Sequence, residues 1–178
     1  MLGRHLGELL PDGVRVLDVG CGDGLLAASI KAVRPDIEIV GIDVRRRPST
    51  WIPVDEFDGR RIPYEDRSLD VVMCVDVFHH ADNPMLLFRE TVRTARRFVL
   101  VKDHLMEGPL AGATLRLMDV VGNARHGVAL PHHYWRRQQW YDACESLELT
   151  IKALGIYPWP VTWAFDRSLH FIARFDVP

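Results

Sequence analysis

Three glycines occupy alternate positions between an apolar run and an apparent helix; they are Gly20, Gly22 and Gly24. Glycine lets the chain turn tightly and lets a ligand approach the backbone with no side chain in between. Amide groups at the start of a helix carry partial positive charge, and in an open α/β sheet such a turn lies at the carboxyl ends of the strands. The spacing therefore predicts a loop that binds a ligand through its backbone.

The residues around these glycines distinguish between two kinds of cofactor. The dinucleotide-binding pattern G-x-G-x-x-G, started at Gly20, requires glycine at position 25, where this chain has Leu25. Asp18 stands two residues before Gly20, and a carboxylate repels a pyrophosphate but attracts an ammonium group. The pattern therefore favours a cofactor with an amino-acid moiety and disfavours a nicotinamide oxidoreductase.

The elements that must position this loop follow from the hydrophobic pattern. Apolar, β-branched runs predict strands at 14–20, 37–43, 69–77 and 97–105, and helical spacing predicts helices at 24–35 and 83–96. Such alternation predicts parallel strands joined by right-handed crossovers in a doubly wound α/β sheet. Further along, we expect a helix at 113–121, a helix from 136, and strands at 149–157 and 170–177.

Composition limits the class of protein. The chain has 178 residues and no evident linker, so we expect a single domain over residues 1–178. Its net charge of -2 gives no electrostatic reason to expect a nucleic-acid partner. The cysteines Cys21, Cys74 and Cys144 are odd in number and far apart, which argues against disulfides and a zinc site, and no metal is expected. Without a signal peptide or an apolar run of about 20 residues, we expect a cytoplasmic protein with no membrane span.

Four motifs in succession resemble those of one enzyme family. VLDVGCGDG (16–24) followed by GID (41–43) resembles the first two motifs of the class I S-adenosylmethionine-dependent methyltransferases. RRIPYEDRSLDVVMCVDVFHH (60–80) resembles their third and fourth motifs, and the likeness covers residues 14–103. The resemblance, to the small-molecule, type 11-like branch, implies a Rossmann-like, mostly parallel seven-stranded sheet with helices on both faces and the last strand antiparallel. It also implies transfer of a methyl group from S-adenosylmethionine to an O, N or C atom of a small molecule.

The resemblance further implies which residues bind S-adenosylmethionine. The glycine loop would wrap the methionine part, with Asp18 near its amino group. Asp43 would accept both ribose hydroxyls, which one carboxylate can do with its two oxygens. Asp58 would lie near the adenine amino group and Asp76 near the methyl group, although Asp18 and Asp76 could instead cap turns. The full expected set is Asp18, Gly20, Cys21, Gly22, Gly24, Asp43, Val44, Asp58, Gly59, Asp76 and Val77.

Methyl transfer from a sulfonium is an in-line displacement, so the protein chiefly has to hold donor and acceptor in a reactive geometry. A base is needed only where the acceptor must lose a proton. We expect His80 and His133 to be the catalytic residues, since His80 matches a histidine common after the fourth strand in this branch. Other candidate bases are His79, His132, Tyr134 and Asp119.

Residues outside the family core are expected to bind the acceptor. An insertion at about 104–140 is a candidate lid over the acceptor. Four tryptophans either pack in the core or offer flat apolar surface to an aromatic or lipid-like acceptor; they are Trp135, Trp140, Trp159 and Trp163. Nucleic-acid methylation is disfavoured because DVFHH stands where such enzymes have an Asn-Pro-Pro-Tyr-type sequence. A regulatory protein that binds S-adenosylmethionine or S-adenosylhomocysteine without catalysis remains the alternative, and the oligomeric state is open.

Overall fold

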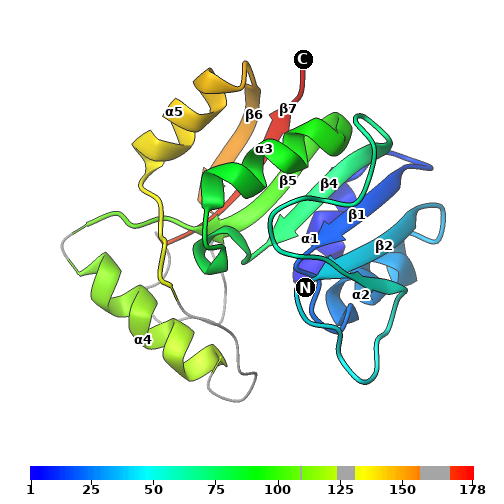
Figure 1. The fold of residues 1–178 in the computed structure, drawn as a ribbon, viewed down its shortest axis with the longest axis horizontal. Helices are drawn as coiled ribbons and strands as arrows, with labels where there is room; N and C mark the ends of the chain where they lie inside the picture. Colours follow the sequence, from blue (N-terminus) through cyan, green and yellow to red (C-terminus); the bar gives the residue numbers. More distant parts are fainter. Residues whose placement is uncertain (109, 124–130, 157–168) are drawn as a thin grey trace.

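The computed structural model describes residues 1–108, 110–123, 131–156 and 169–178. Within these residues seven strands form one sheet in the order β3-β2-β1-β4-β5-β7-β6 (Figure 1). Strands β1 to β5 are parallel, and β7 runs antiparallel between β5 and β6, which confirms the expected sheet. The strands are β1 (Arg15–Val19), β2 (Glu38–Asp43), β3 (Val54–Glu56), β4 (Leu69–Val75), β5 (Ala95–His104), β6 (Thr150–Ile156) and β7 (His170–Asp176).

Helices cover both faces of this sheet. On one face, Leu6 of α1 and Ile30 of α2 pack against buried residues of β1, β2 and β4. On the other face, Phe88 of α3 and Trp140 of α5 pack against β4, β5 and β7. Because β5 is covered on both sides, its side chains are buried continuously from Phe98 to its end. The helices are α1 (Leu2–Leu9), α2 (Leu25–Val33), the 3-10 turn η1 (Phe78–His80), α3 (Pro84–Thr94), α4 (Ala111–Asn123) and α5 (Arg137–Ser146).

Two elements have no counterpart in the sequence prediction. Helix α1 has only eight residues, and two of its three buried positions are Gly3 and Gly7, which have low helix propensity. Strand β3 has three residues, of which only Val54 is buried, too few for a period to be visible. Every helix among the described residues is too short or too polar to cross a lipid bilayer.

Helix α4 stands apart from the two helical layers, beyond the end of β5 (Figure 1). Its buried residues Ala111 and Leu115 pack with Tyr134 and Leu169 in a small cluster separate from those on the sheet. The region predicted as an insertion therefore includes a helix with its own local core. This arrangement places α4 next to the carboxyl ends of the parallel strands.

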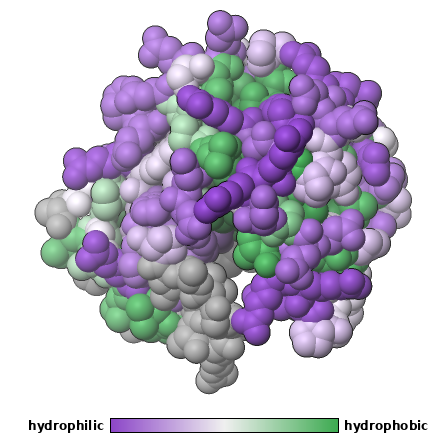
Figure 2. Space-filling model, in the orientation of Figure 1, coloured by the Kyte–Doolittle hydropathy of each residue, from purple (hydrophilic) through white to green (hydrophobic). Residues whose placement is uncertain are grey.

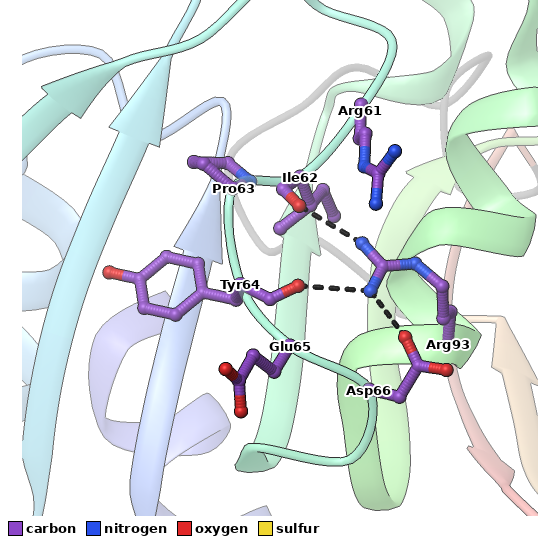
Figure 3. Close-up of a pocket in the computed structure, with 7 residues that line it drawn as sticks. All are labelled: Arg61, Ile62, Pro63, Tyr64, Glu65, Asp66 and Arg93. Carbon is purple, nitrogen blue, oxygen red and sulfur yellow. Dashed lines mark hydrogen bonds and ion pairs between the residues drawn. The ribbon is translucent and has the colours of Figure 1, made fainter.

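A hollow lined by residues 61–66 and Arg93 lies on the segment that leads into β4 (Figure 3). The Arg93 guanidinium donates to the carbonyl oxygens of Ile62 and Tyr64 at 3.0 and 2.9 Å and pairs with Asp66 Oδ1 at 2.7 Å. The Ile62 amide donates to Glu90 Oε2 at 3.0 Å. The Arg93 guanidinium is already paired with groups of this loop, so the hollow marks where the loop is held against α3.

Candidate active site

The three loop glycines all have left-handed backbone, with φ of 70°, 60° and 78° at Gly20, Gly22 and Gly24. A Cβ at Gly20 would come within 2.7 Å of Val77 Cγ2, and one at Gly24 within 2.4 Å of Ile52 Cγ1. A Cβ at Gly22 would meet no atom of the described residues within 4 Å. Packing therefore requires glycine at the first and third positions, whereas Gly22 combines a left-handed backbone with an open side.

Asp43, at the end of β2, braces this loop. Its Oδ2 accepts the Gly22 amide at 2.8 Å, and its Oδ1 accepts the Arg45 amide at 2.9 Å. The loop is also fastened to β2 through the Ile42 carbonyl, which accepts the Gly20 amide at 2.7 Å. A carboxylate has about four acceptor positions, so Asp43 can still accept two hydroxyl donors while it holds Gly22.

Asp18 and Cys21 lie on the inner side of the loop. Burial, together with the nearby Asp43 carboxylate, raises the pKa of Asp18 to about 7. A cationic ligand beside Asp18 would favour its ionised form. The Cys21 side chain packs on Gly41, where an added Cβ would come within 2.4 Å of Sγ, and burial raises the pKa of its thiol. Cys21 is thus a packing residue in a tight turn, and its backbone rather than its thiol is available to a ligand.

Asp58, Gly59 and Val44 lie at the edge of the site. Asp58 is exposed, and its Oδ1 accepts the amides of Arg60 and Arg61, both at 2.8 Å, which lowers its pKa. Gly59 has φ of 73°, and an added Cβ would lie 3.0 Å from Val44 Cγ1. The structure therefore brings Val44 and Gly59 together, and shows Asp58 capping the turn beside them.

Asp76 follows β4 with a left-handed φ of 56°. Both of its carboxylate oxygens lie 2.7 Å from Lys102 Nζ, and its amide donates to the Lys102 carbonyl at 2.8 Å. Burial opposes ionisation of Asp76, but Lys102, and then His104, outweigh burial and lower its pKa. Val77 packs on Gly20, so the end of β4 and the glycine loop are in direct contact.

His79 is held between two carboxylates. It is only 2% exposed; its Nδ1 lies 2.5 Å from Asp103 Oδ1 and its Nε2 lies 3.5 Å from Asp119 Oδ1. Burial would lower the pKa of His79, but Asp103, Asp119 and Asp76 outweigh burial and raise it to about 10. The imidazole is consequently a cation at neutral pH in this arrangement, which makes His79 a poor general base.

The two histidines predicted as catalytic lie on either side of His79. His80 is half-buried in η1, with its ring 4.1 Å from that of His79. His133 is exposed, its amide donates to the His79 carbonyl at 3.1 Å, and its Nδ1 lies 2.8 Å from the Ala81 carbonyl oxygen. Because a carbonyl only accepts, Nδ1 of His133 must carry the proton. In neutral His133 the lone pair is then on Nε2.

Asp119 connects α4 to the other candidate bases. The Tyr134 hydroxyl donates to Asp119 Oδ2, and His132 Nδ1 lies 3.2 Å from the same hydroxyl. Burial raises the pKa of Tyr134, and the bond to Asp119 raises it further. Tyr134 is therefore held as a neutral donor, and Asp119, His132 and His79 belong to one polar network.

The tryptophans divide between core and site. Trp140 is 1% exposed and packs edge-on or stacked with aromatic residues of the core, so it is not a surface for the acceptor. Trp135 is partly buried, with its ring 4.8 Å from that of Trp140. Trp159 and Trp163 lie outside the described residues. A narrow gap, too small to hold a water molecule, is lined by Phe78, His79, Asp103, His104, His133, Trp135 and Trp140.

Three residues at the site were not singled out individually in the sequence prediction. Lys102, Asp103 and His104 are consecutive, at the end of β5, and each is at most 8% exposed. A charged run that closes an apolar strand is the signal that would have found them, since carboxyl ends of neighbouring parallel strands share one edge.

The fold and this edge define a class of protein. The strand order, the glycine turn after β1 and the acid at the end of β2 describe a doubly wound nucleoside-binding domain with its site at the carboxyl ends of the strands. A family model described as "Methyltransferase domain" matches residues 2–154. The chain belongs to this family, within class I of the S-adenosylmethionine-dependent methyltransferases.

Individual relatives agree with this assignment. The chain is 32% identical to an "Uncharacterized methyltransferase" of Mycobacterium sp. (strain JLS), over 66% of this chain and 50% of that protein. It is 31% identical to a "Ubiquinone biosynthesis O-methyltransferase" of Proteus mirabilis, over 47% of this chain and 38% of that protein. The chain thus spans about half the length, or less, of these relatives. A SAM-dependent methyltransferase from Aquifex aeolicus has the same fold, with a TM-score of 0.68, 18% identity and coverage of 98% of this chain and 88% of that one.

Proposed function

We propose that this chain transfers a methyl group from S-adenosylmethionine to an oxygen atom of an apolar small molecule. The observation that carries the proposal is the brace between Asp43 and Gly22, at 2.8 Å, beside the open side of the glycine loop. A loop with backbone amides, an open face and a carboxylate with unused acceptor positions fits an adenosyl amino acid. S-adenosylmethionine, when bound, supplies an activated methyl group.

The described residues support a division of roles along this edge. The loop amides and Asp18 would hold the methionine part, because an ionised Asp18 is best stabilised by an ammonium group. Asp43 would accept the ribose hydroxyls next to Val44, and the turn at Asp58 and Gly59 would face the base. Val77 packs on Gly20, so a methyl group held by the loop would be directed toward the end of β4.

His133 is the group best suited to take a proton from an acceptor hydroxyl. It is exposed, and its bond to the Ala81 carbonyl leaves Nε2 as the acceptor in the neutral form. His80 is the second candidate, and its ring lies 4.1 Å from that of His79. An oxygen acceptor is also consistent with the O-methyltransferase name of the relative from Proteus mirabilis.

The exposed side of α4, opposite to the buried Leu115 and Asp119, is apolar. Leu117, Val120 and Val121 are 65%, 51% and 71% exposed, and on the face shown in Figure 2 apolar residues are visible at the lower left, over α4. A net charge of -2 disfavours nucleic acid as the acceptor. We therefore favour an aromatic or lipid-like alcohol or phenol.

Two measurements test the proposal. Calorimetric titration should show binding of S-adenosylhomocysteine and none of NAD; the reverse preference would refute the cofactor. Incubation with S-adenosylmethionine labelled in its methyl group and an organic extract of cells should move label into extractable small molecules, and His133→Ala should reduce that rate. Binding without any transfer of label would favour the alternative, a regulatory protein that senses this cofactor.

A further inference from the structure

Two imidazoles and two carboxylates converge where β4 and β5 end. His104 Nδ1 lies 3.5 Å from His79 Nδ1, 3.5 Å from Asp103 Oδ1 and 3.5 Å from Asp76 Oδ1. His79 Nδ1 lies 2.5 Å from Asp103 Oδ1. One ligand atom from each of these four residues lies within 4.8 Å of every other. Two nitrogens and two oxygens thus point at one small volume.

We propose that His79, Asp103 and His104 form a binding site for a divalent first-row transition-metal ion such as Zn²⁺. Imidazole and carboxylate are ligands of such ions, and two imidazoles with one carboxylate is a recurrent set that leaves coordination positions open. Bonds of about 2.1 Å at the tetrahedral angle place neighbouring ligand atoms about 3.4 Å apart. The two separations of 3.5 Å already fit, and only the contact between His79 and Asp103 must widen, by about 1 Å.

The groups behind these ligands are arranged as an ion would require. Metal-binding histidines usually donate their second ring nitrogen to a carboxylate, and ligating carboxylates are themselves hydrogen-bonded. His79 Nε2 faces Asp119 Oδ1 at 3.5 Å, and Asp103 Oδ2 accepts the Phe78 amide at 2.9 Å. The His79 ring and the Asp103 carboxylate are therefore held in orientation by atoms outside the ligand set.

Charge balance also favours a cation here. The carboxylates of Asp76, Asp103 and Asp119 contact the two imidazoles, and Lys102 pairs with Asp76. His79 is a cation in the ion-free arrangement, so the three carboxylates then face the positive charges of His79 and Lys102. A bound ion takes the place of the His79 proton, and with neither proton nor ion three negative charges would face one positive charge. Asp103, Asp119 and Lys102 are 2%, 5% and 5% exposed, so solvent screens this imbalance weakly, and a divalent ion would cancel it.

Lys102 decides which residues are ligands. Its Nζ lies 2.7 Å from both oxygens of Asp76, so Asp76 is engaged and is not assigned as the fourth ligand. His133 and Trp135 line the same narrow gap as the three proposed ligands. An ion held there would polarise the oxygen of an acceptor that reached the gap; this role rests on the proposed methyl transfer, whereas binding of the ion does not.

The experiment uses the full chain after treatment with EDTA and dialysis. Calorimetry should show one Zn²⁺ per chain, and Co²⁺ should give visible absorption bands that Zn²⁺ abolishes and millimolar Mg²⁺ does not. His104→Ala and Asp103→Asn should each weaken Zn²⁺ binding at least tenfold, while His5→Ala, a histidine on α1, should leave it unchanged. The X-ray absorption spectrum of the Zn²⁺-loaded unsubstituted chain should show two imidazoles, a readout that does not depend on how the variants fold.

Three results would overturn the proposal: no stoichiometric Zn²⁺ binding, equal binding in His104→Ala and the unsubstituted chain, or a first shell without imidazole. Affinity for S-adenosylhomocysteine, measured on the EDTA-treated chain, separates the two proposals. If the chain binds S-adenosylhomocysteine but not Zn²⁺, the proposed metal site is refuted and the proposed cofactor is not. Absence of S-adenosylhomocysteine binding with Zn²⁺ bound at His79 and His104 refutes the proposed cofactor alone.

Discussion

Asp43→Ala is the most informative single substitution, because Asp43 both braces the glycine loop and is the proposed partner of the ribose. The change removes bonds to the amides of Gly22 and Arg45, at 2.8 and 2.9 Å, and the two proposed bonds to hydroxyl groups. A hydrogen bond to a charged group contributes about 1.5–3 kcal/mol. Water can replace Asp43 as the partner of the hydroxyl groups and offsets part of this free energy. We therefore expect the free energy of cofactor binding to become about 1–3 kcal/mol less favourable.

That free energy corresponds to a dissociation constant about 5- to 150-fold higher for S-adenosylhomocysteine. Calorimetry on Asp43→Ala, Asp43→Asn and the control Asp55→Ala measures it; Asp55 is an exposed carboxylate on the neighbouring β3. Asp43→Asn retains one side-chain oxygen as acceptor and should lie between the other two. An affinity unchanged in Asp43→Ala, in protein whose unfolding midpoint shows an intact fold, would remove Asp43 from the site.

Three further predictions concern single residues. Gly22→Ala and Gly13→Ala each place a side chain on left-handed backbone, at φ of 60° and 63°, so each should lower the free energy of unfolding in denaturant by about 1–2 kcal/mol. Only Gly22→Ala should also bind S-adenosylhomocysteine more weakly. Equal affinities in the two variants would contradict a ligand site at the open face of the loop. Burial and the Asp43 carboxylate raise the pKa of Asp18 to about 7, so this carboxyl group is protonated in more acidic solution. Its affinity for a ligand with an ammonium group should therefore fall about tenfold for each pH unit below 7. Asp18→Asn should flatten this profile, and a profile unchanged in that variant would assign the titration to another group. Arg93→Ala removes hydrogen bonds to two backbone carbonyls and to Asp66, so it should lower the free energy of unfolding in urea by about 2 kcal/mol. The control Arg60→Ala, at an exposed position, should change it by almost nothing. Equal unfolding midpoints for the two variants would show that the loop does not depend on Arg93.

Much of the fold could be predicted from local pattern. The predicted helix at 83–96 corresponds to α3. Its start was recognisable because Pro84 is the first helical residue and Asn83 is the cap, whose side chain accepts the Leu86 amide at 3.0 Å. The buried strands β4 and β5 were recognisable as apolar runs, as strands covered on both faces are. Helix α1 and strand β3 were missed because they are short and bury little on their own.

The structure brings together several predicted site residues, such as Gly22 and Asp43, but contacts between distant segments could not be read from local spacing. Local spacing shows metal ligands only where they are close in sequence, as in paired cysteines, and on that ground no metal was expected. The proposed ligands His79 and His104 are separated by 25 residues and come from the ends of two strands. The sequence left Trp140 open between acceptor surface and core packing, and α5 places its ring in the aromatic core.

The sequence by itself determined the alternation of strands and helices, the glycine turn and the acid at the end of β2, because each depends on residues a few positions apart. Only the tertiary structure decided which charges meet. The parallel pairing of β4 with β5 sets Lys102 against Asp76, and α4 brings Asp119 to His79. Electrostatic partners are chosen by distance through space, and strand pairing and helix packing, rather than local spacing, set that distance.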